Sequence, residues 1–396
     1  MNENLILPAI CVVGYNRIES ICRVLDSVIN ADYTYDGIQL IVSLDHSDLE
    51  EKMTEAVNKK LKNWKNGKSE IRTYDNRLGL RKHILKCGDI SSEYGAVIVL
   101  EDDIVVSPYF YNYTVQALNY YQDDLHIAGI ALYSHKWNGY ARRFFEPLNN
   151  GNDNYFGQFS VTWGQCWSAE QWKRFRKWYG KNSNKLSHMD GVPDVITNWP
   201  DSSWGKYFVH YIVENDLYYV MPYVSLSTNF GDVGQHIKSF SSEHQVPLEY
   251  GKRAYDFADY PNGVKYDIFF ESMDLAKKVS EKYNIENICI DLYGQKEKYK
   301  EKYVITTKKL DYKIVDSYGM LMSPVELNIL YDVKGQDIFL YDISKKEPNK
   351  VVMTRHRYNL INYDIKYLSF KESITYCVSR FKISLGEIWS SMRKKK

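Results

Sequence analysis

Three consecutive carboxylates directly follow an unbroken run of apolar residues. Glu101, Asp102 and Asp103 come after residues 96–100, which are all small or branched apolar residues. Such a run predicts a strand buried on both faces. Adjacent carboxylates repel one another, and ligands of open α/β sheets lie outside the carboxyl ends of strands. The cluster therefore predicts a divalent cation that bridges a carboxylate and a diphosphate. The alternative is an acidic turn that caps a helix over 107–121.

Other charged residues stand just after the neighbouring apolar runs. Arg17 follows the first run, Asp45 the second, and Arg77 and Arg81 the third. Because the carboxyl ends of parallel strands meet at one edge of a sheet, we expect these side chains to lie near the acidic cluster. Cations suit a diphosphate, and the spare carboxylates suit ribose hydroxyls or a general base. Each residue taken singly is better explained as part of a surface salt bridge; their joint placement at strand ends favours a binding site.

The elements that must position these residues alternate between strand and helix. This alternation predicts a doubly wound, mainly parallel α/β sheet. Residues 136–165 are predicted to form a long loop, and Ser168 with Gln171 predicts a capping box. The expected strands are 8–13, 38–44, 70–74, 96–100, 127–133 and 218–227, and the expected helices are 17–29, 48–64, 80–85, 107–121, 202–215 and one from 168.

The chain changes character after about residue 285, where lysine becomes dense. Short strand-like runs at 302–307, 337–341 and 351–354 alternate with turns. We predict a main domain over 1–284, a small appended α+β region over 285–365, and a basic amphipathic tail over 366–396. Two interpretations of the tail remain open: a helix that docks on anionic lipid, and a solvated helix.

Composition limits the partners of the chain. Its 396 residues are 44% hydrophobic and carry a net charge of +1, which gives no sign of a nucleic-acid partner. The 35 tyrosines and nine tryptophans suit a binder of sugars or nucleotides, although a biased genome composition explains them equally well. The six cysteines lack CxxC spacing, so we expect free thiols in a reducing compartment. Neither a signal peptide nor a membrane span is predicted, and a cytoplasmic location is expected.

Six segments, in order, resemble one enzyme family. They resemble the inverting GT-A glycosyltransferases, in particular the N-acetylglucosaminyltransferase I group and its bacterial relatives. The acidic triplet alone is a weak signal, but its combination with the later tryptophan and glycine motifs is more specific. The segments are residues 8–17, 41–45, 99–110, 163–172, 199–204 and 222–236.

The resemblance implies a GT-A fold and a role for each matched residue on the donor side. Asp103 would ligate Mn²⁺ or Mg²⁺, and Glu101 and Asp102 would contact the nucleotide sugar. Arg17 would contact the nucleotide, and Asp45 would hold the uridine. Arg77 is expected to neutralise phosphate charge, and His236 is expected in a loop that closes over the donor.

On the acceptor side, the resemblance indicates Asp201 as the catalytic base. Pro200 departs from the family pattern, so Glu214 and Asp216 remain alternatives. Trp163 and Trp167 would wall the acceptor site, while Trp172 and Phe175 are expected in a helix core.

The function implied is transfer of a sugar from a nucleoside-diphosphate donor, with UDP expected, to a hydroxyl of a glycan or lipid-linked saccharide. Bacterial surface-polysaccharide synthesis at the inner face of the membrane is the expected setting, with peripheral contact through the tail. Two alternatives remain: a non-catalytic carbohydrate-binding protein, and a nucleotidyltransferase. The second would need a glycine-rich loop with a lysine, and residues 13–17 hold a single glycine.

Overall fold

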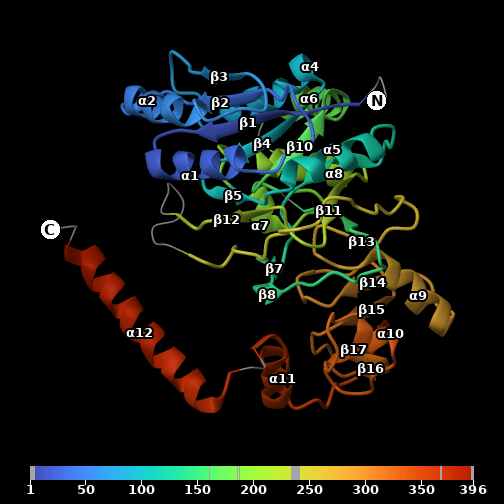
Figure 1. Cartoon of the computed structure of the whole chain (residues 1–396). Coiled ribbons are helices and arrows are strands. Elements are labelled where there is room, and N and C mark those ends of the chain that lie inside the picture. Colours follow the sequence, from blue (N-terminus) through green and yellow to red (C-terminus); the bar gives the residue numbers. More distant parts are fainter. Residues whose placement is uncertain are drawn as a thin grey trace.

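A computed structural model describes residues 5–159, 161–184, 186, 188–232, 241–365 and 368–393. Within this part of the chain, nine strands form one sheet in the order β13-β9-β11-β6-β10-β4-β1-β2-β3 (Figure 1). Five of its eight neighbouring pairs are parallel and three are antiparallel. The predicted mainly parallel α/β sheet is therefore confirmed.

The first half of the sheet is the parallel part, and it follows the predicted alternation. Its strands are β1 (Ala9–Gly14), β2 (Leu40–Leu44), β3 (Ser69–Arg72) and β4 (Ala96–Glu101). Its helices are α1 (Ile18–Ile29), α2 (Glu50–Leu61), α3 (Leu80–Asp89) and α4 (Ser91–Tyr94). Residues 96–100 are buried, as their composition predicts.

The second half of the sheet mixes directions. β10 pairs antiparallel with both β4 and β6, and β9 pairs antiparallel with β11. The strands are β6 (Ile127–Ala131), β9 (Asn154–Gly157), β10 (Gln165–Ser168), β11 (Tyr218–Pro222) and β13 (Lys265–Tyr266). The prediction of a long loop over 136–165 was wrong, because β9 and the hairpin of β7 (Trp137–Asn138) with β8 (Arg143–Phe144) lie within it.

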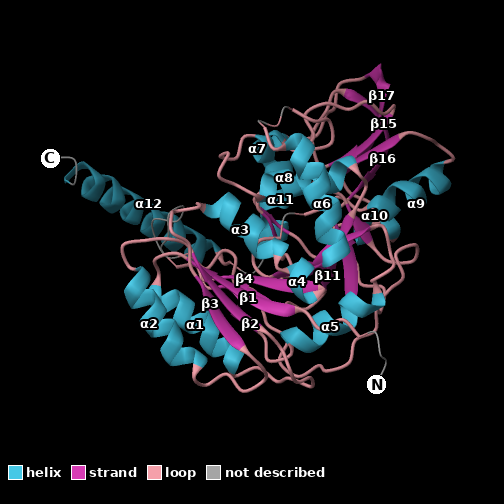
Figure 2. Ribbon diagram, turned by 90° about the horizontal axis from the view of Figure 1, so that it is seen from above, coloured by secondary structure: helices cyan, strands magenta, loops and turns pink. Residues whose placement is uncertain are grey.

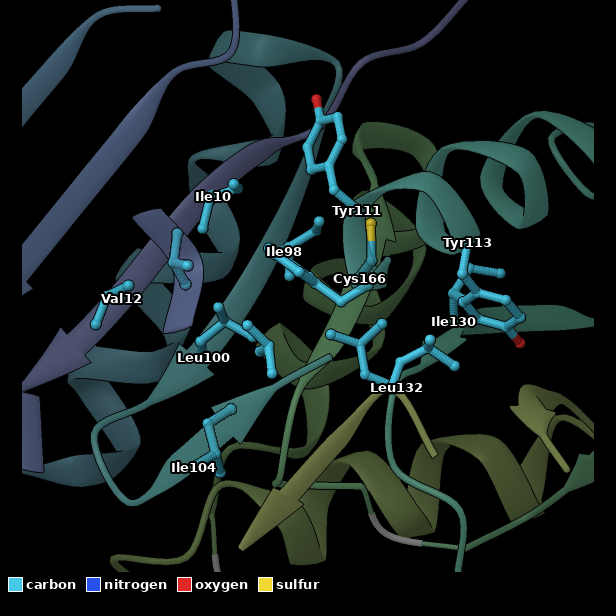
Figure 3. Packing of buried hydrophobic residues seen from close by; sticks show 14 of the residues in the cluster. Ile10, Val12, Ile98, Leu100, Ile104, Tyr111, Tyr113, Ile130, Leu132 and Cys166 are labelled. Atoms are coloured by element: carbon cyan, nitrogen blue, oxygen red, sulfur yellow. The ribbon is translucent and has the colours of Figure 1, made fainter. Parts of the chain in front are cut away.

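Helices cover both faces of the sheet (Figure 2). Successive side chains of β1 point to opposite faces of the sheet, so they pack against the helices of different layers. Ile10 and Val12 pack in the cluster that contains α1, α2 and α5 (Phe110–Tyr120). Figure 3 shows both residues beside Ile98, Leu100 and Tyr111.

The opposite face of β1 packs against other helices. Cys11 and Val13 lie in the cluster that contains α3, α6 (Ala169–Asn182) and α8 (Gly205–Glu214). The predicted capping box at Ser168 and Gln171 begins α6. β5 (Ile104–Val106) directly follows the acidic triplet and pairs with β12 (Ser227–Asn229). α7 (Asp194–Thr197) precedes α8.

The C-terminal part contains a second sheet with a core of its own. The prediction of a strand over 351–354 was wrong, because a helix begins at Met353. That helix presents buried His356 and partly buried Leu360 and Tyr363 on one face, a spacing that outweighs the β-propensity of the preceding valines. The elements are α9 (Met273–Tyr283), β14 (Ile288–Asp291), β15 (Tyr303–Thr306), β16 (Tyr312–Tyr318), α10 (Leu327–Leu330), β17 (Ile338–Lys346), α11 (Met353–Ile365) and α12 (Phe370–Arg393).

Leu275 and Val279 of α9 pack in the core of this second sheet, so that core includes residues before 285. The division of the chain at 284 and 365 stays a prediction. All six cysteines are free; Cys377 is exposed and Cys22 is half-buried, whereas the other four are buried. Among the described helices, none combines the length and apolar character needed to span a bilayer.

Candidate functional site

The carboxyl ends of β1, β2 and β4 meet at one edge of the sheet. Val13 lies opposite Glu101, and Gly14 lies opposite Leu44, so the residues that follow these strands are neighbours. The structure thereby brings together Arg17, Asp45 and the acidic triplet, as the strand pattern predicts.

Arg17 is bound to the second carboxylate of the triplet. Its Nε lies 3.1 Å from Oδ2 of Asp102, and its Nη2 donates to Oδ1 of the same carboxylate. The Nη2 atom also lies 3.6 Å from Oδ2 of Asp103. Burial acts to lower the pKa of Arg17, but the two carboxylates outweigh burial and leave that pKa above its ordinary value. Arg17 is therefore a fixed positive charge at this edge.

The triplet holds more negative charge than Arg17 can balance. Burial, opposed by Arg17, raises the pKa of Asp102 to about 6. Burial and the charges of Asp103 and Asp102 raise the pKa of Glu101 well above its ordinary value. Both shifts show that a further cation at this position would be stabilised electrostatically.

Asp103 is the residue of the triplet best suited to hold such a cation. Its Oδ1 atom is buried without a hydrogen-bond partner, and its backbone oxygen accepts from Phe230 N at 2.7 Å. Carboxylate oxygen is a ligand that Mg²⁺ and Mn²⁺ prefer, and Mg²⁺ usually takes one or two carboxylates with phosphate and water. Among the described residues, no group of three or more His, Cys, Asp or Glu is arranged as a complete metal site. The residues present thus fit a cation that is shared with a substrate.

Asp45 is buried and anchors the loop that follows β3. Its Oδ1 accepts from Leu78 N at 2.7 Å and from His46 N at 3.0 Å, and its Oδ2 accepts from Gly79 N at 2.9 Å. The same loop presents Arg77, whose guanidinium carbon lies 4.6 Å from the centre of the Tyr15 ring. Asp45 therefore positions Arg77 beside the edge of β1, and its contact with a uridine stays a prediction.

A buried polar group under this loop was not singled out by the sequence. His83 Nε2 lies 2.7 Å from Ser43 Oγ, which is 3.0 Å from the hydroxyl of Tyr74. Burial acts to lower the pKa of His83, but bonding to the thiol of Cys87 and the charges of Cys87 and Asp45 outweigh it, so that pKa is raised. The only sequence signal was the spacing of His83 and Cys87 by one helical turn.

The segment after β12 lies against the triplet. Phe230 contacts Asp103 through its backbone, and its ring lies 3.7 Å from the guanidinium carbon of Arg23. Asp232 accepts from Ser20 Oγ at 2.6 Å and from Arg23 Nη2. Sequence reasoning missed Arg23 and Asp232, although Arg23 stands one turn and a half after Arg17 on the same helix. His236 lies outside the described residues.

The three candidates for a catalytic base have different partners. Asp201 lies before α8 and bonds Lys206 Nζ at 2.7 Å, while Lys206 is only 2% exposed. Glu214, at the other end of α8, accepts from Trp178 Nε1 at 2.8 Å. Asp216 accepts from the hydroxyl of Tyr218 at 3.0 Å. A ten-residue helix spans about 15 Å, so Asp201 and Glu214 cannot serve the same hydroxyl.

Contacts connect the Asp201 end of α8 to the donor edge. Gly79 is held by Asp45, and two residues later Arg81 Nη1 donates to the hydroxyl of Tyr207 at 2.6 Å. Tyr207 adjoins Lys206, the partner of Asp201. The amino-terminal end of α8, rather than the Glu214 end, therefore faces the edge that carries the triplet.

The tryptophans of 163–172 divide between core and surface. Trp167 is fully buried, so the expectation that it walls an acceptor site was wrong; its indole packs between β4 and α8. Trp172 and Phe175 are buried in the same cluster, as predicted. Trp163 is half-buried, and its ring centre lies 4.6 Å from that of His244.

Several solved structures show distant similarity to this chain. The mannosyltransferase PcManGT from Pyrobaculum calidifontis, in complex with GDP-Man and Mn²⁺, is 13% identical with a TM-score of 0.34, and the match covers 54% of this chain and 55% of that one. GalNAc-T7 with UDP, GalNAc and Mn²⁺ is 14% identical with a TM-score of 0.39, over 58% and 44%. TarS from S. aureus is 13% identical with a TM-score of 0.31, over 51% and 33%. The matches thus span about half, or less, of those proteins.

No curated protein matches the chain significantly. Residues 9–171, from β1 to the first turn of α6, match the family described as Glycosyl transferase family 2. This segment contains β1, β2 and β4 with Arg17, Asp45 and the acidic triplet, on a mainly parallel sheet with helices on both faces that is consistent with the GT-A fold. Residues 9–171 of the chain are therefore similar in sequence to the glycosyltransferase family 2 domain.

Proposed function

We propose that this chain transfers a sugar from a nucleoside-diphosphate donor to a hydroxyl of a glycan or lipid-linked saccharide, with a divalent cation. The observation that carries the proposal is the buried Oδ1 atom of Asp103, which has no partner and lies at the carboxyl end of β4 in the segment similar to the glycosyltransferase family 2 domain. Most buried polar atoms of folded proteins have a hydrogen-bond partner, so an unpaired carboxylate oxygen at this edge of the sheet favours a bound cation.

Asp103 would hold Mn²⁺ or Mg²⁺, with the remaining ligands supplied by the diphosphate and water. When bound, the cation neutralises charge on the departing nucleoside diphosphate. Arg17 holds Asp102 in place and supplies a positive charge at the same edge, and the loop-borne Arg77 adds a second. Glu101 would contact the nucleotide sugar from the carboxyl end of β4.

Asp201 would accept the proton of the attacking hydroxyl. It is favoured over Glu214 because its end of α8 is tied to the donor edge through Tyr207 and Arg81. Its carboxylate lies 2.7 Å from Lys206 Nζ, a contact that holds the side chain at this end of the helix, and a carboxylate can accept a proton. One base and one displacement at the anomeric carbon invert its configuration.

The finer assignments belong to the same proposal. UDP is the nucleotide we expect, with Asp45 near the uridine, Mn²⁺ as a suitable cation, and His236 in a loop that closes over the donor. The N-acetylglucosaminyltransferase I group is the subfamily we expect, and bacterial surface-polysaccharide synthesis is the setting, on the cytoplasmic side of the membrane.

The test is a screen of nucleotide sugars for thermal stabilisation and for hydrolysis without an acceptor, each with Mn²⁺, with Mg²⁺ and with a chelator. We expect one donor to stabilise the protein and to be hydrolysed slowly, in both cases only when the cation is present. A carbohydrate-binding protein would instead be stabilised by free saccharides whether or not metal is present. Release of diphosphate from nucleoside triphosphates would indicate the nucleotidyltransferase alternative.

A further inference from the structure

Exposed hydrophobic side chains are concentrated in the last part of the chain. Nearly half of the large hydrophobic residues that the described chain exposes lie between residues 352 and 385. Folded proteins rarely leave such residues gathered at one place unless that surface has a partner. In Figure 1, α12 extends away from the central sheet, with α11 beside the second sheet.

The apolar residues of α12 lie on one face of the helix. At 100° per residue, Phe370, Ile374, Val378, Phe381 and Leu385 fall within an arc of about 80°. All five are exposed, and the two phenylalanines most of all, at 82% and 66%. The helix is therefore amphipathic, and no described part of the chain covers its apolar face.

α11 adds a second apolar surface while being firmly attached to the body. Its outer residues Tyr358, Ile361 and Ile365 are exposed at i, i+3 and i+7. On its other face Asp364 bonds Arg143 Nε of β8 at 2.8 Å, and His356 Nε2 lies 2.7 Å from Thr307 O. The outer surface of α11 is thus held at a fixed place on the molecule.

The charge of this segment differs from that of the rest of the chain. Residues 352–396 contain ten Lys or Arg and three Asp or Glu, a net charge of +7. Because the whole chain has a net charge of +1, residues 1–351 carry −6. The segment that exposes the most apolar side chains is therefore also strongly basic.

Charge decides between the two occupants that could cover such a face. In a pair of α12 helices from two copies, the flanking Lys371, Arg380 and Lys382 would meet the same cations of the partner, because α12 has only Glu372 and Glu387 to oppose them. An anionic bilayer complements both properties, since it accepts the apolar face and attracts the basic flanks.

We propose that α11 and α12 form an interfacial anchor that lies on an anionic lipid surface, with the apolar face of α12 inserted among the acyl chains. The anchor does not depend on which donor the catalytic domain uses. It does place the body of the protein, through Arg143 and Asp364, beside the surface on which a lipid-linked saccharide would be found.

The experiment measures flotation of the full chain with vesicles of phosphatidylcholine, with and without added phosphatidylglycerol. We expect binding only when phosphatidylglycerol is present. Phe381→Gln should weaken that binding about tenfold or more, since it removes an aromatic side chain that would be buried among the acyl chains. The matched control is Tyr376→Gln, an equally exposed aromatic on the opposite face of α12, which should bind as the unchanged chain does.

Neutralising the basic flank gives a second, independent measurement. Lys371→Gln with Lys382→Gln should weaken binding about 20-fold, and added salt should abolish the difference from the unchanged chain. Equal binding to neutral vesicles, or equal losses for Phe381→Gln and Tyr376→Gln, would overturn the proposal. So would a lipid-free dimer that Phe381→Gln converts to a monomer. Donor hydrolysis in the absence of vesicles should be the same in all variants, which separates this test from that of the proposed function.

Discussion

Two buried acidic clusters in this protein look alike in composition and differ in how their oxygens are used. One is the triplet at the end of β4. The other lies where the second sheet meets the main sheet and consists of Asp267, Glu271 and Asp291. Each contains a glutamate whose pKa is raised well above its ordinary value, chiefly by burial.

The second cluster is largely satisfied from within the chain. Asp291 accepts from Gln295 N at 2.7 Å, Lys296 N at 3.0 Å and the hydroxyl of Tyr299 at 2.7 Å. Lys296 Nζ also lies 3.1 Å from Asp267 Oδ2. Every aspartate there has donors that the fold itself supplies, so this cluster stabilises a junction.

The triplet is not satisfied in this way. Arg17 is the one described cation paired with it, and Asp103 retains a buried oxygen without a donor. Burying an unpaired carboxylate oxygen lowers stability unless a ligand compensates. In the second cluster Oε2 of Glu271 is also buried without a partner, so neither acidity nor one unpaired oxygen identifies a functional cluster. The triplet differs because one described cation, Arg17, is paired with it and because it stands at the carboxyl ends of parallel strands.

The strongest test of this contrast is Asp103→Asn. Loss of a cation that stabilises the leaving group should remove several kcal/mol of transition-state stabilisation, so transfer should fall about 10³-fold or more. The free energy of unfolding should stay the same or rise, because an unpaired charge is removed. Calorimetry with Mn²⁺ measures the loss of the cation, and denaturant unfolding measures the change in the free energy of unfolding. Asp36→Asn, an exposed change at the amino end of β2, is the control. Full activity in Asp103→Asn would place the cation elsewhere.

Asp201→Asn tests the residue that we propose as the base on the acceptor side. We expect transfer to fall about 10²-fold, at the lower end of the range for a general base, while nucleotide binding with Mn²⁺ is unchanged. Glu214→Gln, at the far end of α8, should keep nearly full activity. Steady-state rates and nucleotide titrations of the two variants decide the matter, and a reversed pattern would make Glu214 the base.

Asp291→Ala addresses the second cluster. It leaves the backbone N of Lys296 and the hydroxyl of Tyr299 without an acceptor and removes the carboxylate that lies 3.3 Å from Lys308 Nζ. We therefore expect a loss of about 3 kcal/mol of unfolding free energy, as for other broken buried ion pairs. Urea titration measures it, and Glu170→Gln, in an exposed ion pair, should change stability by less than about 0.5 kcal/mol. If folded Asp291→Ala lost cation-dependent nucleotide binding, the second cluster would have a role in ligand binding and not only in stability.

The two clusters also differ in how well the sequence predicts them. Glu101 to Asp103 are adjacent and follow a uniformly apolar strand, so local pattern and strand topology suffice. Asp267, Glu271 and Asp291 come from separate segments, and only tertiary folding brings them together. The capping box at Ser168 is likewise local and was confirmed.

The errors in the fold have the same origin. Residues 154–157 form a strand because β11 and β13, which are distant in sequence, lie on either side of them. Their own residues, Asn-Tyr-Phe-Gly, carry no strong strand signal. Asp232 and Arg23 were missed for the same reason, since their bond joins segments more than 200 residues apart. Residue-level roles in the site remain predictions that mutation must test.

A smaller effect concerns the dependence of stability on pH. The pKa of Asp102 is about 6 in the folded chain and about 3.9 in an unfolded one. The folded state therefore binds more protons between these values, and stability should fall as the pH rises from about 4 to about 6. Asp102→Asn should remove at most about 3 kcal/mol of this fall, at 1.36 kcal/mol for each pKa unit. Unfolding at several pH values measures it, and an unchanged slope would mean that Arg17 already holds the carboxylate ionised.

The smallest expected effect is that of Arg77→Ala. Arg77 is exposed and rests on Tyr15, so solvent screens its charge and it holds no buried partner in place. If it neutralises phosphate charge beside the triplet, the KM for the donor should rise a few-fold, with kcat and stability nearly unchanged. The effect should shrink as salt is added, because a screened charge acts over a short range. Lys62→Ala, an exposed cation after α2, is the matched control and should leave the KM unaltered. A change in kcat rather than KM would show that Arg77 acts in the transition state, as Asp103 is expected to. Arg77 would then belong with the triplet in the catalytic site, and not only to the loop that supports it.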